Sequence, residues 1–212
     1  DDRRERAKLV YGLLDARYPD SRPLLHFSSP FELLIGVILS AQTTDRQVNE
    51  VIPALFRHYP DAAALGRAAP EDVEPLIHST GFYRQKAKSI IATAVRISEV
   101  YGGEVPGRME DLLTLPGVGR KSANVVRGHI FDEPAIIVDT HFSRVVRRLG
   151  LSGETAPERI ETELTLSVEP EQQTRFSMIV NYHGRDTCFA LKPECPSCPL
   201  KAHCLHYASL KA

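Results

Sequence analysis

The chain lacks tryptophan, long apolar runs and an excess of charge of either sign. Its 212 residues include 26 lysines and arginines and 27 acidic residues, which gives a formal net charge of −1 at pH 7. Bulk positive charge of the kind that coats DNA is therefore excluded, although local basic patches are not. The longest apolar run, Leu33 to Leu39, is too short to span a bilayer. The length predicts one good core or two lobes that share a cleft.

Cysteine is absent from residues 1–187, and the four cysteines of the chain all lie in one C-terminal segment. Cys188, Cys195, Cys198 and Cys204 are separated by six, two and five residues; we call residues 188–204 the cysteine segment. Two disulfides would require an oxidising compartment, but the charged stretch Asp1–Lys8 has no apolar run behind it of the kind found in a secretory signal. We therefore expect a reduced cytoplasmic setting, in which the four thiolates hold a metal ion or an iron–sulfur cluster.

Zinc and iron–sulfur remain the two alternatives for this segment. Zinc sites usually pair two Cys-X-X-Cys units, and only Cys195–Cys198 has that form. The wide first gap and the nearby prolines favour a [4Fe–4S] cluster around which a loop wraps, but the spacing alone does not decide between the two metals.

Helical periodicity occurs along the whole chain, and no stretch alternates cleanly as a half-buried strand does. The one strand-like run, Ala135–Val138, is too short to build a sheet. We therefore expect an all-α protein. Helices are predicted over Phe31–Leu39, Asp45–Tyr59, Pro70–His78, Gln85–Tyr101, Met109–Thr114, Arg120–Ile130, Pro157–Val168 and Glu171–Thr187, with another beginning at Asp139. The first of these is entered through Ser28, Ser29 and Pro30, a pattern typical of an N-terminal helix cap.

Basic residues gather in three runs, within 84–96, 120–127 and 144–148. A single run is usually a solvated helix face. The second run, however, directly follows the sequence Leu-Pro-Gly-Val-Gly at residues 115–119, which we call the hairpin turn. Gly117 and Gly119 can leave backbone N–H groups uncovered, and the next helix adds further unpaired N–H groups at the positive end of its dipole. The turn is thus predicted to bind one phosphate group without reading a base.

Residues 115–126, Leu-Pro-Gly-Val-Gly-Arg-Lys-Ser-Ala-Asn-Val-Val, resemble the helix–hairpin–helix of the endonuclease III family of DNA glycosylases. Val138-Asp-Thr-His141 and Leu39-Ser-Ala-Gln-Thr-Thr-Asp45 resemble two other segments of that family, and the cysteine spacing is similar to its [4Fe–4S] loop. The resemblance implies the all-α helix–hairpin–helix DNA glycosylase fold with two helical lobes. One lobe would be a bundle over residues 22–132, and the other would combine residues 1–21 and 133–212 with the C-terminal [4Fe–4S] cluster loop.

The same resemblance implies a bifunctional DNA glycosylase and AP lyase of base excision repair. Such an enzyme removes oxidised pyrimidines from duplex DNA and cuts the strand by β-elimination, here as a monomer in the cytoplasm, at the nucleoid of a bacterium. Adenine-removing relatives carry a glutamate where Gly36 stands and lack the hairpin lysine. One alternative is a cluster-containing DNA-binding or damage-sensing module with weak or no catalysis. Another is an enzyme that recognises alkylated or deaminated bases.

Lys121 and Asp139 are the predicted catalytic residues. Lys121 lies at the positive end of a helix beside Arg120, which favours the neutral amine that a Schiff base requires. The resemblance assigns the nucleophile to this lysine. Asp139 opens an apolar helix, as an N-cap does. The resemblance adds that it supports the developing charge on the sugar and assists proton transfer.

The resemblance also identifies residues that contact DNA. Gln42 and Phe82 would fill the space left by a flipped nucleotide, with Phe82 at a position where leucine is more familiar. His141 lies beside the site, where a structural histidine is the competing interpretation. The remaining predicted contacts come from the hairpin turn and the residue after it: Leu115, Gly117, Val118, Gly119 and Arg120.

Overall fold

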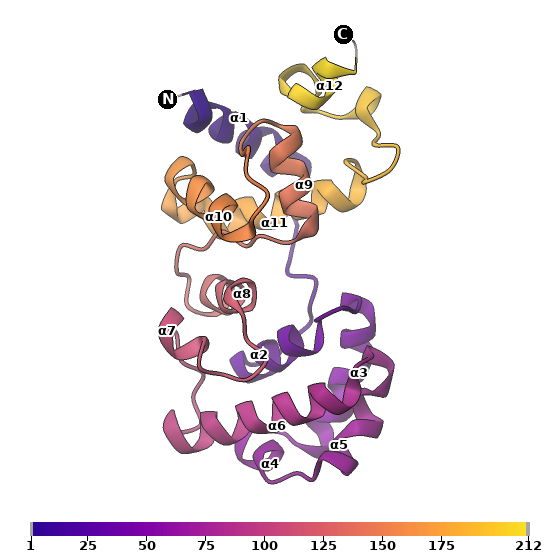
Figure 1. Cartoon of the computed structure of the whole chain (residues 1–212), viewed down its shortest axis with the longest axis vertical. Coiled ribbons are helices and arrows are strands. Elements are labelled where there is room, and N and C mark those ends of the chain that lie inside the picture. The colour runs from indigo at the N-terminus through magenta and orange to yellow at the C-terminus, as the bar shows by residue number, and fades with distance from the viewer. Residues whose placement is uncertain (1, 211–212) are drawn as a thin grey trace. The chain divides into compact units, whose positions relative to one another are not determined.

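The computed structural model describes residues 2–210, and these residues form helices and loops with no β-strand (Figure 1). Ala135–Val138, the strand-like run, forms no strand. The prediction of an all-α protein is confirmed. The α-helices are α1 (Asp2–Arg17), α2 (Pro30–Leu39), α3 (Asp45–His58), α4 (Ala62–Gly66), α5 (Pro70–Ile77), α6 (Tyr83–Val100), α7 (Met109–Leu112), α8 (Arg120–Ile130), α9 (Thr140–Arg148), α10 (Pro157–Ser167), α11 (Gln173–Asp186) and α12 (Leu205–Ser209).

Short 3₁₀ helices complete the described structure. They are η1 (His78–Thr80), η2 (Pro170–Gln172), η3 (Cys195–Ser197) and η4 (Lys201–His203). The five-residue helices α4 and α12 were not predicted, because a single turn is too short to show a 3.6-residue period. No helix among the described residues is long and apolar enough to cross a membrane.

The chain forms two compact units. The hairpin unit comprises Pro23–Asp132, and the cysteine unit comprises Asp1–Arg22 together with Glu133–Ala212. The cysteine unit is therefore built from both ends of the chain, with α1 packed against α10 and α11. Each unit has its own hydrophobic core, which is what separate folding units require.

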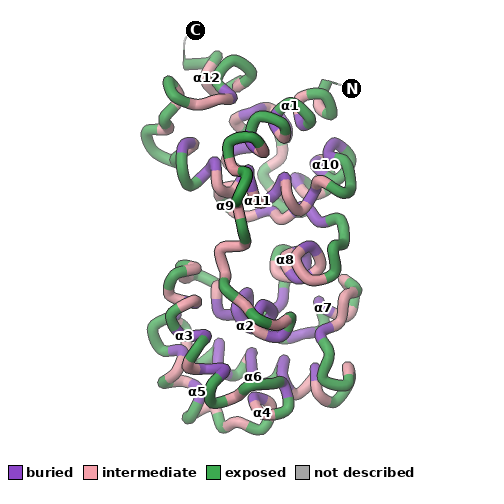
Figure 2. Tube along the Cα trace, turned by 180° about the vertical axis from the view of Figure 1, so that it is seen from behind, coloured by how far each residue is buried: buried purple, intermediate pink, exposed green. Residues whose placement is uncertain are grey.

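Helix α2 is the centre of the hairpin unit. Phe31 and every residue from Leu33 to Leu39 are buried, and α2 packs against α3, α6 and α8 (Figure 2). The start of the helix follows the predicted capping pattern. Pro30 is the first helical residue, the Ser29 hydroxyl accepts the Glu32 amide at 3.1 Å, and the Glu32 carboxylate accepts the Ser28 amide at 2.8 Å.

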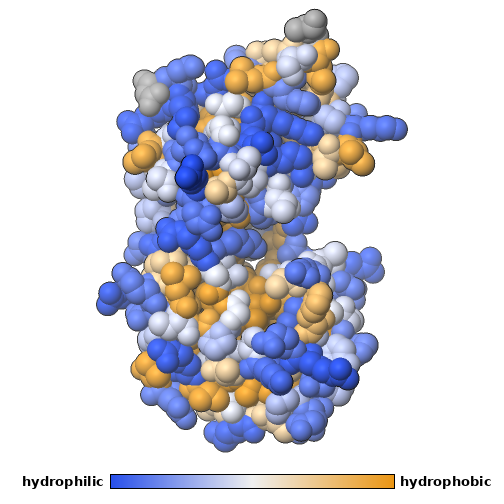
Figure 3. Space-filling model, viewed as in Figure 1, coloured by the Kyte–Doolittle hydropathy of each residue, from blue (hydrophilic) through white to orange (hydrophobic). Residues whose placement is uncertain are grey.

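The cysteine unit is built around α9 and α11, which pack closely together. Phe142 of α9 and Phe176 of α11 are fully buried, and their rings meet edge to face at 6.0 Å between centroids. Leu14 of α1 joins the same core. Figure 3 shows that, on the face drawn there, hydrophilic residues cover much of the surface of the chain.

Two glycines provide a matched test of packing. A Cβ on Gly66 would lie 3.2 Å from the Val95 backbone nitrogen, whereas a Cβ on Gly12 of α1 would have no neighbour within 4 Å. We expect Gly66→Ala to destabilise the hairpin unit by about 1–3 kcal/mol, because backbone cannot move aside as a side chain can. Gly12→Ala should stabilise the protein by about 0.5–1 kcal/mol, because it removes a helical glycine.

Calorimetric unfolding of the two variants beside the parent chain measures both effects. Equal transition temperatures for Gly66→Ala and the parent would contradict the close approach of α4 to α6.

Candidate functional site

The hairpin turn joins α7 to α8 and depends on a glycine at position 117. Gly117 has φ +81°, in the left-handed region, and a Cβ there would lie 2.9 Å from Ile38 Cγ2. The Pro116 carbonyl accepts the Thr93 hydroxyl at 2.8 Å, which holds the turn against α6. Conformation and space therefore both exclude a side chain at position 117.

The predicted contact residues of the turn do not all face solvent. Leu115 and Val118 are buried in the hairpin-unit core, and their backbone N–H groups donate to the Leu112 and Leu115 carbonyls at 3.1 Å. Gly117, Gly119 and Arg120 are exposed. No side chain caps the N-terminus of α8, which begins after Gly119. The first turn of α8 thus presents backbone N–H groups and a positive dipole end, as an anion site requires.

Lys121 is the second residue of α8 and is exposed. Its side-chain amine makes no hydrogen bond or ion pair with the residues that the structure describes, so this amine is available to a ligand. The predicted nucleophile is therefore adjacent to the predicted phosphate-binding turn, and both lie at the N-terminus of α8.

Gln42 and Phe82 occupy two strained turns of the hairpin unit. Both have left-handed backbone conformations, with φ 53° and 47°, which cost a residue with a side chain roughly 1–2 kcal/mol. Gln42 is exposed in the loop between α2 and α3, and Phe82 is 68 % exposed at the start of α6. Core packing therefore does not explain Phe82.

Lys86 fixes the turn that carries Phe82. It is only 5 % exposed, and its Nζ donates to the Thr80 carbonyl at 2.7 Å. Burial lowers the pKa of the Lys86 amine. The first basic run is therefore not a uniform solvated face, because this lysine is a buried structural contact. Sequence analysis missed its role because its neighbours in the run are ordinary exposed residues.

Asp139 is the N-cap of α9, as its sequence position predicted. One carboxylate oxygen accepts the Phe142 amide at 2.7 Å, and the other accepts the side-chain amide of Asn181 on α11. Asp139 also lines a pocket of about 820 Å³ in the cysteine unit, beside Arg144 and Arg147. The carboxylate is thus held at both oxygens while it borders open space.

His141 and most of the third basic run have structural partners. Arg144 lies 3.2 Å from His141 Nδ1 and donates to the Gly184 carbonyl at 2.7 Å. Arg148 donates to the carbonyls of Phe189 and Ala190 at 2.7 and 3.0 Å. These arginines therefore tie α9 to the residues around the first cysteine, and the solvated-face interpretation is wrong for both.

The four cysteines form no disulfide and line one pocket together with apolar side chains such as Val145 and Leu149. Arg148 Nη1 donates to Cys188 Sγ at 3.3 Å. Burial, followed by the charges of neighbouring thiols, raises the pKa of Cys195, and burial raises the pKa of Cys198. No three or more His, Cys, Asp or Glu side chains among the described residues are grouped to hold a single metal ion.

Thiols of this number are a donor set that suits a metal ion or an iron–sulfur cluster. All four border one shared space, and the Arg148 guanidinium contacts the sulfur of the first. The three consecutive contacts of Arg148 also show that the start of the cysteine segment is positioned from α9.

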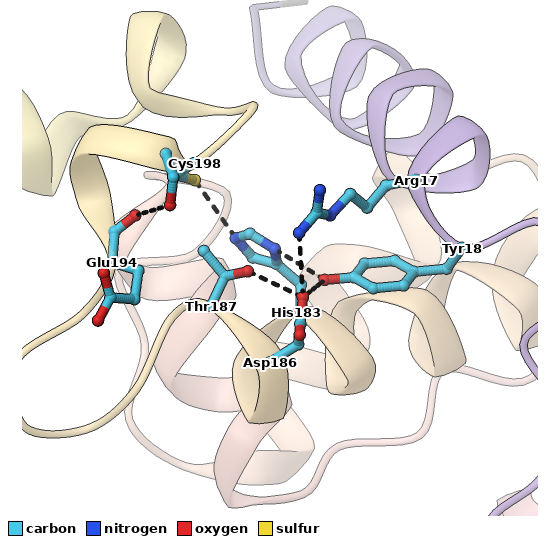
Figure 4. A network of polar contacts seen from close by, with 8 residues as sticks. Arg17, Tyr18, His183, Asp186, Thr187, Glu194 and Cys198 are labelled. Carbon is cyan, nitrogen blue, oxygen red and sulfur yellow. Dashed lines mark hydrogen bonds and ion pairs between the residues drawn. The ribbon is translucent and has the colours of Figure 1, made fainter.

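A polar network links the cysteine segment to the N-terminal helix (Figure 4). His183 is 1 % exposed and lies between Cys198 Sγ, 3.5 Å from Nε2, and the Tyr18 hydroxyl, 3.4 Å from Nδ1. Tyr18 donates to Asp186 at 2.8 Å, and Arg17 pairs with the same carboxylate at 3.4 Å. Burial lowers the pKa of His183 to about 4, so the ring is neutral near pH 7.

Comparison with known proteins identifies the family of this chain. The model of the HhH-GPD superfamily of base excision DNA repair proteins matches residues 35–170. Endonuclease III of Synechocystis sp. is 47 % identical over 95 % of this chain and 93 % of its own length. Endonuclease III of Escherichia coli K12 is 42 % identical over 85 % of each chain.

Two solved structures of endonuclease III give the same result. One is a non-covalent complex with DNA and the other a trapped covalent intermediate with DNA. Each has a TM-score of 0.93 and 37 % identity to this chain. The alignments cover 98 % of both chains in the first case and 99 % in the second. The chain belongs to the endonuclease III family of the HhH-GPD superfamily, which confirms the resemblance read from the sequence.

The two hydrogen bonds of Asp139 predict different effects for two substitutions. Asp139→Ala removes the N-cap and leaves the Asn181 amide without its carboxylate, so we expect a loss of about 1–2 kcal/mol of unfolding free energy. Asp139→Asn retains a good capping oxygen and loses only the acceptor for the Asn181 amide, so its loss should be about 1 kcal/mol smaller than that of Asp139→Ala. Urea unfolding compares them, and equal losses for both variants would refute a capping role.

Proposed function

We propose that this chain is a bifunctional DNA glycosylase and AP lyase that removes oxidised pyrimidines from duplex DNA. The observation that carries the proposal is the exposed Lys121, which follows an uncapped glycine turn at the start of α8. Membership of the endonuclease III family supports the same activity. Its place of action in a bacterial cell would be the nucleoid.

The proposed reaction uses Lys121 as nucleophile and Asp139 as the charged support. The Nζ lone pair attacks the sugar C1′ as the bond from C1′ to the base breaks, and the base leaves with the electron pair of that bond. Loss of a proton from nitrogen and ring opening give a Schiff base. The departed base then takes a proton from C2′, a double bond forms between C2′ and C3′, and the bond from C3′ to the phosphate oxygen breaks in a β-elimination. The Asp139 carboxylate stabilises the positive charge that develops on the sugar.

Binding of the duplex would combine phosphate contacts with extrusion of the damaged nucleotide. The N–H groups of the hairpin turn and Arg120 would hold one phosphate of the backbone. Gln42 and Phe82 would enter the stack where the nucleotide has left it. Their exposure on turns of unfavourable backbone conformation supports this role, because neither side chain contributes to the core. His141 would support Arg144, which lies 3.2 Å from its Nδ1 and lines the same pocket as Asp139.

The cysteine segment would hold a [4Fe–4S] cluster through Cys188, Cys195, Cys198 and Cys204. A cluster with a full set of cysteine ligands would leave no open iron position for substrate, so its role at this site would be to hold the loop in place. The protein groups around it hold the loop: Arg148 supports the residues after Cys188, and Lys201 donates to the Pro196 carbonyl at 2.8 Å.

Borohydride trapping tests the nucleophile. The parent chain should form a covalent adduct with a duplex that contains an abasic site, because hydride reduces the Schiff base to a stable amine. Lys121→Ala should lose the adduct entirely. Lys8→Ala, which removes an exposed lysine of α1, is the matched control and should trap normally.

The same duplexes separate the alternatives. DNA binding without trapping by the parent chain would indicate a binding or sensing module and refute the enzyme. Trapping on abasic DNA together with excision of alkylated or deaminated bases, but not oxidised pyrimidines, would retain the lyase and replace the proposed substrate class.

Metal analysis tests the cofactor. The purified parent chain should be brown, absorb in the violet-blue, and contain iron and sulfide in equal amounts. Cys198→Ser should lose most of this iron, because Cys198 is one of the four thiols lining the pocket. Ser197→Ala, at an exposed neighbouring position, should keep it. Zinc without sulfide in the parent chain would contradict the proposal.

A further inference from the structure

Asn181 of α11 lies between the Asp139 carboxylate and a guanidinium. Its side-chain nitrogen donates to Asp139 Oδ2, and its side-chain oxygen accepts from Arg185 Nε at 2.9 Å. Asn181 and Arg185 are four residues apart, so they occupy one face of the helix. The three side chains form a hydrogen-bonded series that ends on the predicted catalytic carboxylate.

Chemistry permits only one orientation of this amide. A guanidinium has donors and no acceptor, whereas an ionised carboxylate has acceptors and no donor. The amide oxygen must therefore face Arg185, and the nitrogen must face Asp139. Arg185 thereby determines which end of Asn181 is presented to the carboxylate.

The Phe142 amide alone does not hold the Asp139 carboxylate in one orientation. The terminal torsion of an aspartate side chain has a broad energy minimum, so one accepted hydrogen bond leaves rotation about it. A second donor at the other oxygen removes that freedom. The helix that supplies this donor is itself well anchored, because Ile179 and Val180, which directly precede Asn181, are fully buried.

We propose that Asn181 is a positioning residue for the reaction, which turns and holds the Asp139 carboxylate toward the pocket that it lines. This inference rests on the proposed function, because it assigns to Asn181 a part in base excision. A small misplacement of a catalytic group can cost a large part of the rate even when the group itself remains. Asn181 thus acts through Asp139 and does not touch the substrate.

Single-turnover excision with Asn181→Leu tests the proposal. Leucine has a similar volume but can neither donate nor accept. We expect the rate constant for release of an oxidised pyrimidine to fall about 10-fold at saturating enzyme, because the loss concerns orientation in the transition state. The Kd for the same duplex should change by less than about 2-fold. Asn181→Ser, a smaller change, should lower the rate in the same direction if Asn181→Leu does not fold.

Tyr182→Phe is the matched control. It removes one hydrogen bond from the neighbouring residue of α11, which donates to the Arg22 carbonyl at 2.7 Å, and leaves Asp139 untouched. Its excision rate should equal that of the parent chain. A fall of the same size in Tyr182→Phe would show that any weakening of α11 slows the reaction, and would overturn a specific role for Asn181.

A double-mutant cycle with Asp139→Asn completes the test. If Asn181 acts through Asp139, Asn181→Leu should change the rate by less than about 2-fold in the Asp139→Asn background. If the two substitutions instead lower the rate independently, so that their fold-losses multiply in the double variant, the inference is overturned. It is also overturned if the parent chain is active and Asn181→Leu releases the base at the same rate. A parent chain that releases no base would instead overturn the proposed function, and with it any part for Asn181.

Discussion

The close contact of Gly117 with Ile38 governs the position of the hairpin turn and the start of α8. Because position 117 has no Cβ, the turn lies directly on α2, the most completely buried helix of the hairpin unit. The Thr93–Pro116 hydrogen bond attaches the same turn to α6. The helix that carries Lys121 thus begins at a turn packed against the hairpin-unit core. Such fixed placement is what a nucleophile needs, the role that we propose for Lys121.

The residues proposed to act on DNA share a second physical property. Gln42, Phe82 and Gly117 all have a positive φ, and two of them carry side chains for which this conformation is unfavourable. The surrounding contacts, such as the buried Lys86 beneath Thr80, stabilise these turns against that cost. Strained backbone is thus present at both turns from which a side chain is proposed to enter the DNA, as well as at Asp132 and Lys192.

Prediction from the sequence succeeded where the determinants are local. The capping residues before Pro30, the glycines of the hairpin turn and the cap at Asp139 depend on neighbours within four residues, and the structure contains each of them. Asn181 and His183 could not be identified in this way. Asn181 is 42 residues from Asp139, and His183 is 165 residues from Tyr18. In the sequence both are ordinary helical residues, because their partners come close only when α11 packs against α9 and α1.

The discontinuity of the cysteine unit has a consequence for synthesis of the chain. The hairpin unit is one continuous segment, so it can complete its core as soon as Asp132 has left the ribosome. Helix α1 precedes the hairpin unit in the chain, yet Ala7, Val10 and Leu14 are buried against residues translated after position 133. Helix α1 therefore gains its core partners only after the hairpin unit has been made, and the four cysteines come together only once Cys204 has been added.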